Sequence, residues 1–215
     1  MSAAAAAAPH LIADLELLRR HLAIERWSIV GVSWGTTLAL AYAQAHTHRV
    51  SAIVLAGVTT TSRREVQWIT NGVGRIFPAE WERFAAVAHG NPDRELRLPG
   101  LYNELLFHED AAVRERAARE WCIWEDAHVS LAPGYAPNRR FEDPAFRLLF
   151  ARLVTHYWKH AAFLDEDQLI RNRYDISSPL ETAWRLHKAW PPASCTSYTT
   201  PDTAAARCPQ LWSPL

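Results

Sequence analysis

The 215-residue sequence predicts an α/β fold, with a parallel sheet and a long helical segment. Two short apolar runs, 27–30 and 52–56, are typical of buried strands, and the Ala- and Leu-rich run 36–44 between them is typical of a helix. A strand, a helix and a strand in series form a βαβ unit, whose two strands run parallel. From about residue 62 to 165 strand-like runs give way to helical segments rich in Trp, Arg, Glu and Ala.

The turn that joins the first strand to the helix carries Gly31-Val32-Ser33-Trp34-Gly35. In this setting a Gly-x-Ser-x-Gly pattern resembles the nucleophile elbow of α/β-hydrolases, a turn so tight that the serine hydroxyl is exposed above the sheet. We expect the two glycines to allow this tight turn, and the serine backbone to be strained. The following helix N-terminus would direct the amide of Trp34 at a developing oxyanion. A glycine-rich turn with a capping serine is the structural alternative.

An amphipathic helix is expected before the first strand. Its apolar stripe would face the core, with acidic residues early in the helix and basic residues late. The stripe consists of Leu11, Ile12, Leu15, Leu18 and Leu22.

Composition excludes several classes of partner. Lys plus Arg and Asp plus Glu both number 23, so no basic field indicates nucleic acid. No apolar run approaches the length of a membrane span. Three cysteines, an odd number without metal-like spacing, fit a reducing compartment. We therefore expect a cytoplasmic protein that binds neither nucleic acid nor a membrane nor a metal, with an oligomeric state that composition does not reveal.

The change of texture along the chain predicts four parts. Residues 1–61 form a partial core with the elbow, and residues 62–165 form a helical lid. Residues 166–191 return to the core. Residues 192–215, in which Pro, Ser, Thr and Ala follow no period, form an irregular tail.

Segments spread over residues 10 to 191 resemble the proline iminopeptidases, which are serine peptidases. The resemblance implies an α/β-hydrolase fold with an incomplete parallel sheet and an inserted helical lid. Such enzymes release N-terminal proline from short peptides without a metal or an organic cofactor. The matching segments are 14–19, 31–35, 37–44, 121–125, 150–152, 156–157, 165–168, 173–175 and 181–191.

The resemblance also implies roles for the residues of a catalytic triad. Ser33 would be the nucleophile, the amide of Trp34 one oxyanion donor, and Asp175 the acid. The family's His-Gly-Gly-Pro-Gly loop, which supplies a second oxyanion donor, has no counterpart here, and an expected core strand before Asp175 is missing. The one histidine after Asp175 is His187, and its helix should pack beside the sheet and not reach the nucleophile.

A substrate-binding carboxylate is implied in the lid. Glu125 matches the group that binds the protonated N-terminus of the substrate, with Trp121 and Trp124 on the same helical face. A solvated helix carboxylate is the alternative for Glu125. Where the family tends to place a second carboxylate, this chain has Val154.

Three functions therefore stay open: a serine aminopeptidase, an esterase or amide hydrolase of the same fold, and a non-catalytic remnant that at most binds small peptides. One nucleotide out of frame, plausible codons for residues 195–204 can encode an Ala-Gly-His-Ser turn like that of the family. We hypothesise that residues from about 192 onward are a frameshifted ending, which DNA sequencing would test.

Overall fold

The structure of the chain, a computed structural model, describes residues 7–88, 94–131, 134–165 and 168–171. The described residues divide into two compact units. The first unit holds those up to Glu65 and from Ala162 onward, and the second unit is Val66–Ala161.

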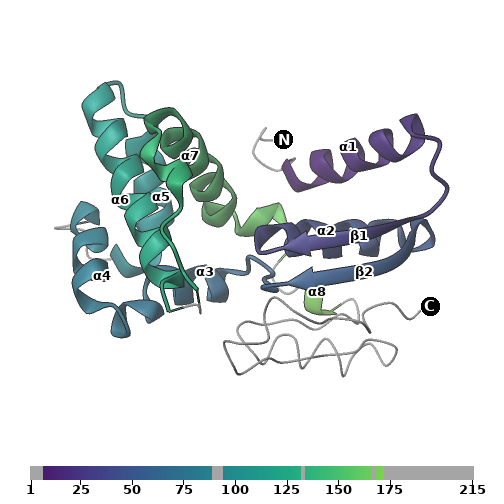
Figure 1. Ribbon diagram of the computed structural model, residues 1–215, viewed down its shortest axis with the longest axis horizontal. Coiled ribbons are helices and arrows are strands. Elements are labelled where there is room, and N and C mark those ends of the chain that lie inside the picture. The colour runs from purple at the N-terminus through teal and green to yellow at the C-terminus, as the bar shows by residue number, and fades with distance from the viewer. Residues whose placement is uncertain (1–6, 89–93, 132–133, 166–167, 172–215) are drawn as a thin grey trace. The chain divides into compact units, whose positions relative to one another are not determined.

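A small parallel sheet forms the centre of the first unit (Figure 1). Its two described strands run parallel, with Ile29 opposite Ile53 and one register shift between Trp27 and Ser28, and α2 packs on both strands. The predicted βαβ unit is therefore confirmed. The elements of this unit are α1 (Ala7–His21), β1 (Trp27–Val32), α2 (Trp34–Ala45), the 3₁₀ turn η2 (Thr47–Arg49), β2 (Val50–Ala56) and α8 (Gln168–Arg171).

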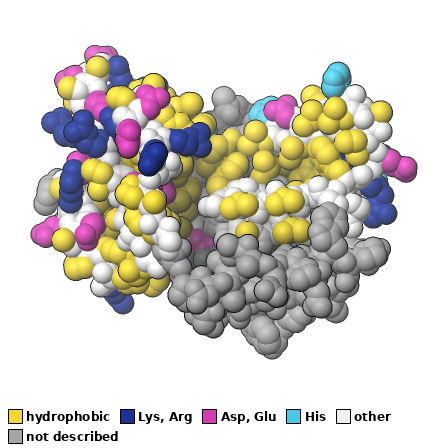
Figure 2. All heavy atoms as spheres, viewed as in Figure 1, with side chains coloured by type: hydrophobic (Ala, Val, Ile, Leu, Met, Phe, Trp, Pro, Cys, Tyr) yellow, Lys and Arg dark blue, Asp and Glu magenta, His cyan; other side chains and the backbone are white. Residues whose placement is uncertain are grey.

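Strand β1 has one covered and one exposed face, because successive side chains point to opposite sides of a strand. Ile29 packs against the buried Tyr42 of α2. On the opposite face Val30 and Val32 are 72% and 64% exposed. Figure 2 shows hydrophobic side chains gathered over the strands on the side in view.

The expectation that the apolar stripe of α1 faces the core is wrong for its C-terminal half. Leu18 and Leu22 are 48% and 53% exposed, whereas Glu16 and Arg19 are buried. A buried charge is tolerated when it is paired and fully hydrogen-bonded. The C-terminal half of the helix therefore docks through a buried polar pair and not through the leucines of its apolar stripe.

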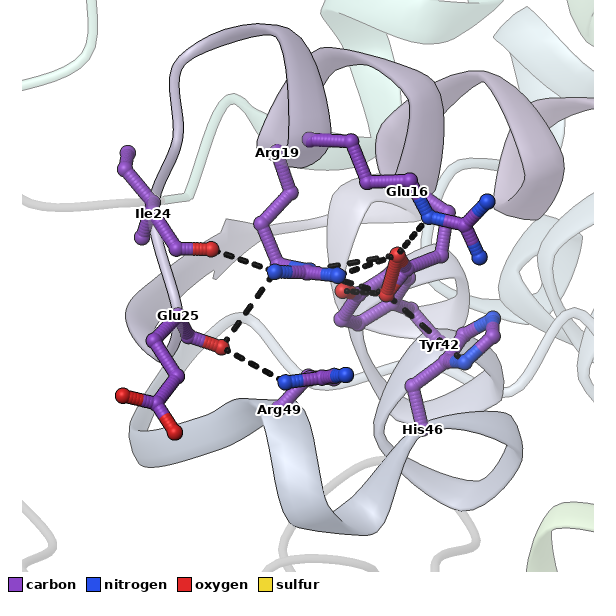
Figure 3. Close-up of polar contacts among 8 residues, drawn as sticks. Glu16, Arg19, Ile24, Glu25, Tyr42, His46 and Arg49 are labelled. Atoms are coloured by element: carbon purple, nitrogen blue, oxygen red, sulfur yellow. Dashed lines mark hydrogen bonds and ion pairs between the residues drawn. The ribbon is translucent and has the colours of Figure 1, made fainter.

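The pair is satisfied by partners from outside α1 (Figure 3). Arg19 donates to the Glu16 carboxylate at 2.8 Å, to the Ile24 carbonyl, and to the Glu25 carbonyl at 3.3 Å. The hydroxyl of Tyr42 donates to Glu16 at 3.1 Å. The hydrogen bonds from Arg19 lower the pKa of the Glu16 carboxyl from 4.5 to about 2. One side-chain cluster thus ties α1 both to α2 and to the loop before β1.

Every described secondary-structure element of the second unit is an α-helix or a 3₁₀ turn, and helical segments are what the sequence predicts for this part of the chain. Helix α3 (Arg63–Thr70) leads into it from the first unit. Its longer helices begin with acidic caps: Asp110 and Asp143 each accept a hydrogen bond from the backbone two residues on. The remaining elements are η3 (Gly72–Arg75), α4 (Pro78–Ala85), η4 (Ala86–Ala88), α5 (Arg94–Leu106), α6 (Ala111–Val129), η5 (Arg139–Glu142), α7 (Pro144–Lys159) and, at the return to the first unit, η6 (Ala161–Phe163).

Several predicted features lie outside the described residues, among them Asp175, His187 with the helix expected to carry it, and the tail from 192. In the part of the chain that is described, no helix has the length and apolar character needed to cross a membrane.

Candidate active site

Ser33 lies between the last residue of β1 and the first residue of α2, as the elbow hypothesis predicts. Its backbone has φ 52° and ψ −126°, and its side chain is exposed. A positive φ at a residue with a side chain costs about 1–3 kcal/mol and persists only when the surroundings enforce it. The predicted strain at Ser33 is confirmed, and the hydroxyl is presented to solvent at the carboxyl end of a parallel strand.

Backbone hydrogen bonds enforce this conformation from both sides. The Ser33 N–H donates to the Ala56 carbonyl at 2.9 Å, which extends the pairing of β1 with β2 by one residue. The Ser33 carbonyl accepts from the Thr36 N–H at 2.8 Å, in the first turn of α2. Ser33 is therefore held by the neighbouring strand and by its own helix.

Two buried threonines connect the start of α2 to the segment that follows β2. The Thr36 and Thr37 hydroxyls lie 3.0 and 2.8 Å from the Thr59 carbonyl, and the Thr59 N–H donates to Thr36 Oγ1 at 2.9 Å. This contact was not predicted. A threonine pair directly after the elbow and a threonine run, 59–61, directly after the next strand are the signal that could have identified it.

The same segment is held from its other end by an acidic side chain. The buried Glu65 carboxylate accepts hydrogen bonds from the Thr59 hydroxyl and from the Thr60 N–H, both at 2.7 Å. Hydrogen bonds to a carboxylate are among the stronger ones in proteins. The strand-to-helix turn thus rests on a loop that is itself fixed.

The two glycines of the elbow differ in how closely they are packed. A side chain at Gly31 would place its Cβ 2.8 Å from the Gly35 carbonyl oxygen and 3.0 Å from Thr36 Cα. Among the described residues, a Cβ at Gly35 would meet nothing within 4 Å. Of the two glycines, Gly31 is therefore the one at which the described residues leave no room for a side chain.

Trp34 is the first residue of α2. Its amide belongs to the first turn, where N–H groups point out of the helix end and the helix dipole favours negative charge. This position agrees with the predicted oxyanion donor, a role that stays a prediction.

In the second unit, the Glu125 carboxylate contacts two donors of its own helix. Trp121 Nε1 donates to Oε1 at 3.0 Å, and His128 Nε2 lies 3.2 Å from Oε2. The Glu125 and His128 side chains are 15% and 14% exposed. Glu125 is thus half-buried, and the alternative of a freely solvated helix carboxylate does not describe its surroundings.

The two tryptophans predicted beside Glu125 belong to the core of the second unit. Trp124 stacks on Phe84 with centroids 5.1 Å apart, and Trp121 meets Phe84 edge-on at 5.6 Å. Both indoles are at most 1% exposed. They support the helix that carries Glu125, and their predicted contact with a substrate stays a prediction.

Cys122 is unsuited to act as a nucleophile in place of Ser33. Its side chain is buried, and burial raises the pKa of the thiol to about 12.

His156 and His160 lie side by side, with ring centroids 5.5 Å apart. Among the described residues, no group of three or more His, Cys, Asp or Glu side chains could hold a metal ion.

Comparisons with known proteins identify the family. The family described as alpha/beta hydrolase fold matches residues 7–191. The chain is 48% identical over 201 residues to a probable proline iminopeptidase of Streptomyces coelicolor. This alignment covers 85% of this chain and 61% of the relative. It is 40% identical over 200 residues to the proline iminopeptidase of Xylella fastidiosa, covering 86% and 63%. It is 36% identical over 199 residues to that of Arabidopsis thaliana, covering 85% and 52%.

The predicted resemblance to proline iminopeptidases is thereby confirmed. The chain spans 52% to 63% of the length of these three relatives. Because the family match extends over most of the sequence and includes the elbow, this chain belongs to the α/β-hydrolase fold family.

Proposed function

We propose that this chain carries the nucleophile and the substrate-binding carboxylate of a serine aminopeptidase that releases N-terminal proline from short peptides. The observation that carries the proposal is Ser33, exposed and held at positive φ between a parallel strand and a helix N-terminus. The names of the relatives support the choice of substrate. The odd number of cysteines supports a cytoplasmic location.

The proposed chemistry is acyl transfer through a covalent intermediate. The Ser33 hydroxyl gives its proton to a base as Oγ attacks the carbonyl of the N-terminal proline. The Trp34 amide stabilises the resulting oxyanion, and the peptide amine leaves with the proton that the base took from Ser33. Water, deprotonated by the same base, then attacks the acyl-enzyme and releases proline, and the proton returns to Ser33. Glu125 pairs with the cationic amine of the substrate, which an esterase has no need to bind.

A labelling experiment tests the proposed nucleophile. Modification of Ser33 by an aryl phosphonate, which phosphonylates activated serines, would support the proposed nucleophile, and intact-protein and peptide mass spectrometry would identify the site. Ser33→Ala is the control. Absence of labelling at Ser33 would contradict an activated nucleophile and would favour the non-catalytic remnant.

Substrate analogues separate the peptidase from an esterase on the same fold. We expect any turnover of L-proline 4-nitroanilide to disappear when the proline nitrogen is acetylated, because the acetylated nitrogen carries no charge for Glu125. Hydrolysis of 4-nitrophenyl acetate that exceeds anilide hydrolysis, and that does not depend on Glu125, would favour the esterase.

A further inference from the structure

Glu125 is held at both of its carboxylate oxygens, and the two donors lie on opposite sides of it along α6. Trp121 Nε1 contacts Oε1 at 3.0 Å from one turn before, and His128 Nε2 lies 3.2 Å from Oε2 almost one turn after. An ionised carboxylate only accepts hydrogen bonds, so the histidine nitrogen is the donor in this contact. The plane of the carboxylate is therefore fixed from two directions.

Both donors lie beside buried aromatic side chains. The Trp121 indole is fully buried and meets Tyr102 and Trp158 edge-on at 5.2 and 5.6 Å. The His128 ring lies 6.0 Å from the ring of the buried Trp124. An exposed ion pair on a helix contributes little to stability, because both side chains must be ordered in water. The Glu125–His128 pair instead packs beside the buried Trp124.

We propose that His128 is a positioning residue, which together with Trp121 orients the Glu125 carboxylate to receive the secondary ammonium group of an N-terminal proline. This inference rests on the proposed function. A proline nitrogen carries two N–H donors, and each carboxylate oxygen keeps a further lone pair after accepting one hydrogen bond. An oriented carboxylate can accept both donors without first losing rotamer freedom.

The proposed role of His128 depends on its hydrogen bond to Glu125 and not on a positive charge, and substitutions can distinguish the two. Its Nε2–H donates both in the neutral tautomer and in the imidazolium, so a neutral donor of similar reach should replace it. A side chain of similar bulk without a donor should not. If a hydrogen-bond donor orients Glu125, His128→Gln should keep the affinity for the protonated amine that His128→Leu loses.

Ligand binding tests this inference without requiring turnover. The probes are L-prolinamide, whose ring nitrogen is protonated at pH 7, and N-acetyl-L-prolinamide, which is neutral there. We expect the unsubstituted chain to bind L-prolinamide more tightly, as measured by isothermal titration calorimetry. His128→Leu should weaken L-prolinamide binding about tenfold, the scale of one hydrogen bond to a charged group, and should leave the weak binding of the acetylated probe unchanged.

Matched variants complete the design. His128→Gln should regain most of the lost affinity, and His21→Leu, which removes an exposed imidazole of the first unit, should have no effect. If His128→Leu does not fold, His128→Phe takes its place, since it keeps a ring against Trp124 and has no donor.

The outcomes distinguish the two proposals. If Glu125→Gln abolishes the preference for L-prolinamide but the donor-free His128 variant binds within twofold of the unsubstituted chain, the amine site stands and the role of His128 is overturned. If the unsubstituted chain does not prefer L-prolinamide, or if Glu125→Gln leaves that preference intact, the amine site itself fails, and the inference fails with it.

Discussion

Ser33, Gly31 and Gly35 belong to one five-residue motif but differ in backbone conformation and in packing. The serine carries the positive φ, and Gly31 makes the close contact with the following helix. Gly35 lies within α2, in open space and without a positive φ. A pattern that reads as symmetrical in the sequence is therefore asymmetrical in three dimensions.

Alanine at the two glycines should have opposite effects on stability. Gly31→Ala should lower the free energy of unfolding by about 1–3 kcal/mol, because the new Cβ forces backbone atoms apart. Gly35→Ala should raise it by up to about 1 kcal/mol, since alanine is the better helix former. Urea unfolding of both variants, followed by far-UV circular dichroism, checks this. A similar loss in both would contradict the contact described at Gly31.

The site residues could be predicted from their own pattern only where that pattern involves neighbouring residues of the sequence. Ser33 follows from a five-residue spacing with a strand on one side and a helix on the other. Glu125 was identified through resemblance and not through its own pattern. The contact of Thr59 with the elbow joins residues 23 apart, and the pairing of His128 with Glu125 is a common helix spacing without a distinctive sequence signal.

At the scale of the elements, α1 shows the limit of reading a face from periodicity. Its position and approximate length were predicted, as were β1, α2 and β2, because apolar spacing and turn residues are local properties. Its buried side was not, because Glu16 and Arg19 become acceptable in a core only when Tyr42 and the loop before β1 supply partners. Sequence periodicity carries no information on such distant partners.

The cluster around Glu16 should make the docking of α1 sensitive to acid. Its folded pKa, about 2, lies below the ordinary value of 4.5, so the folded chain binds this proton less tightly than the unfolded chain. The stabilisation is therefore complete above pH about 4.5 and is lost as pH falls toward 2. Glu16→Gln should be less stable than the unsubstituted chain at pH 7, and the difference should shrink over that interval.

Urea unfolding at several pH values measures this difference. Asp14→Asn, which removes an exposed carboxylate from the same helix, is the matched control and should show little effect. A stability difference for Glu16→Gln that stays constant between pH 5 and 2 would contradict the role of the charged pair.

At the scale of the whole molecule, exposed apolar side chains should limit solubility. Val30 and Val32 are more than half exposed, and Leu17 on α1 is 63% exposed. Patches of this kind promote association. Replacing both valines with threonine keeps the preference for a strand and should reduce self-association in sedimentation velocity. Ile76→Thr, at an exposed position of the second unit, should have no comparable effect.

The activity of the 215-residue chain should be low even though its nucleophile is well formed. Loss of the base in a serine triad typically costs about 10⁴-fold or more in rate, and we expect that His187, the one histidine after Asp175, does not reach Ser33. We expect hydrolysis of L-proline 4-nitroanilide at least ~10⁴-fold slower than by an intact relative. Turnover within tenfold of that relative, abolished by Ser33→Ala, would show that another residue serves as the base.

The hydrogen bonds that hold the elbow have a consequence for how the chain folds. The Ser33–Ala56 and Thr36–Thr59 contacts each join residues 23 apart across a parallel crossover, whereas the backbone hydrogen bonds of α7 join residues within one helical turn. Contacts between distant residues require a longer loop to close and form more slowly than local ones. Pulse-labelled hydrogen exchange should therefore protect the amides of α7 before the Ser33 amide. The nucleophile would then acquire its geometry late in folding, only when β1 and β2 have paired.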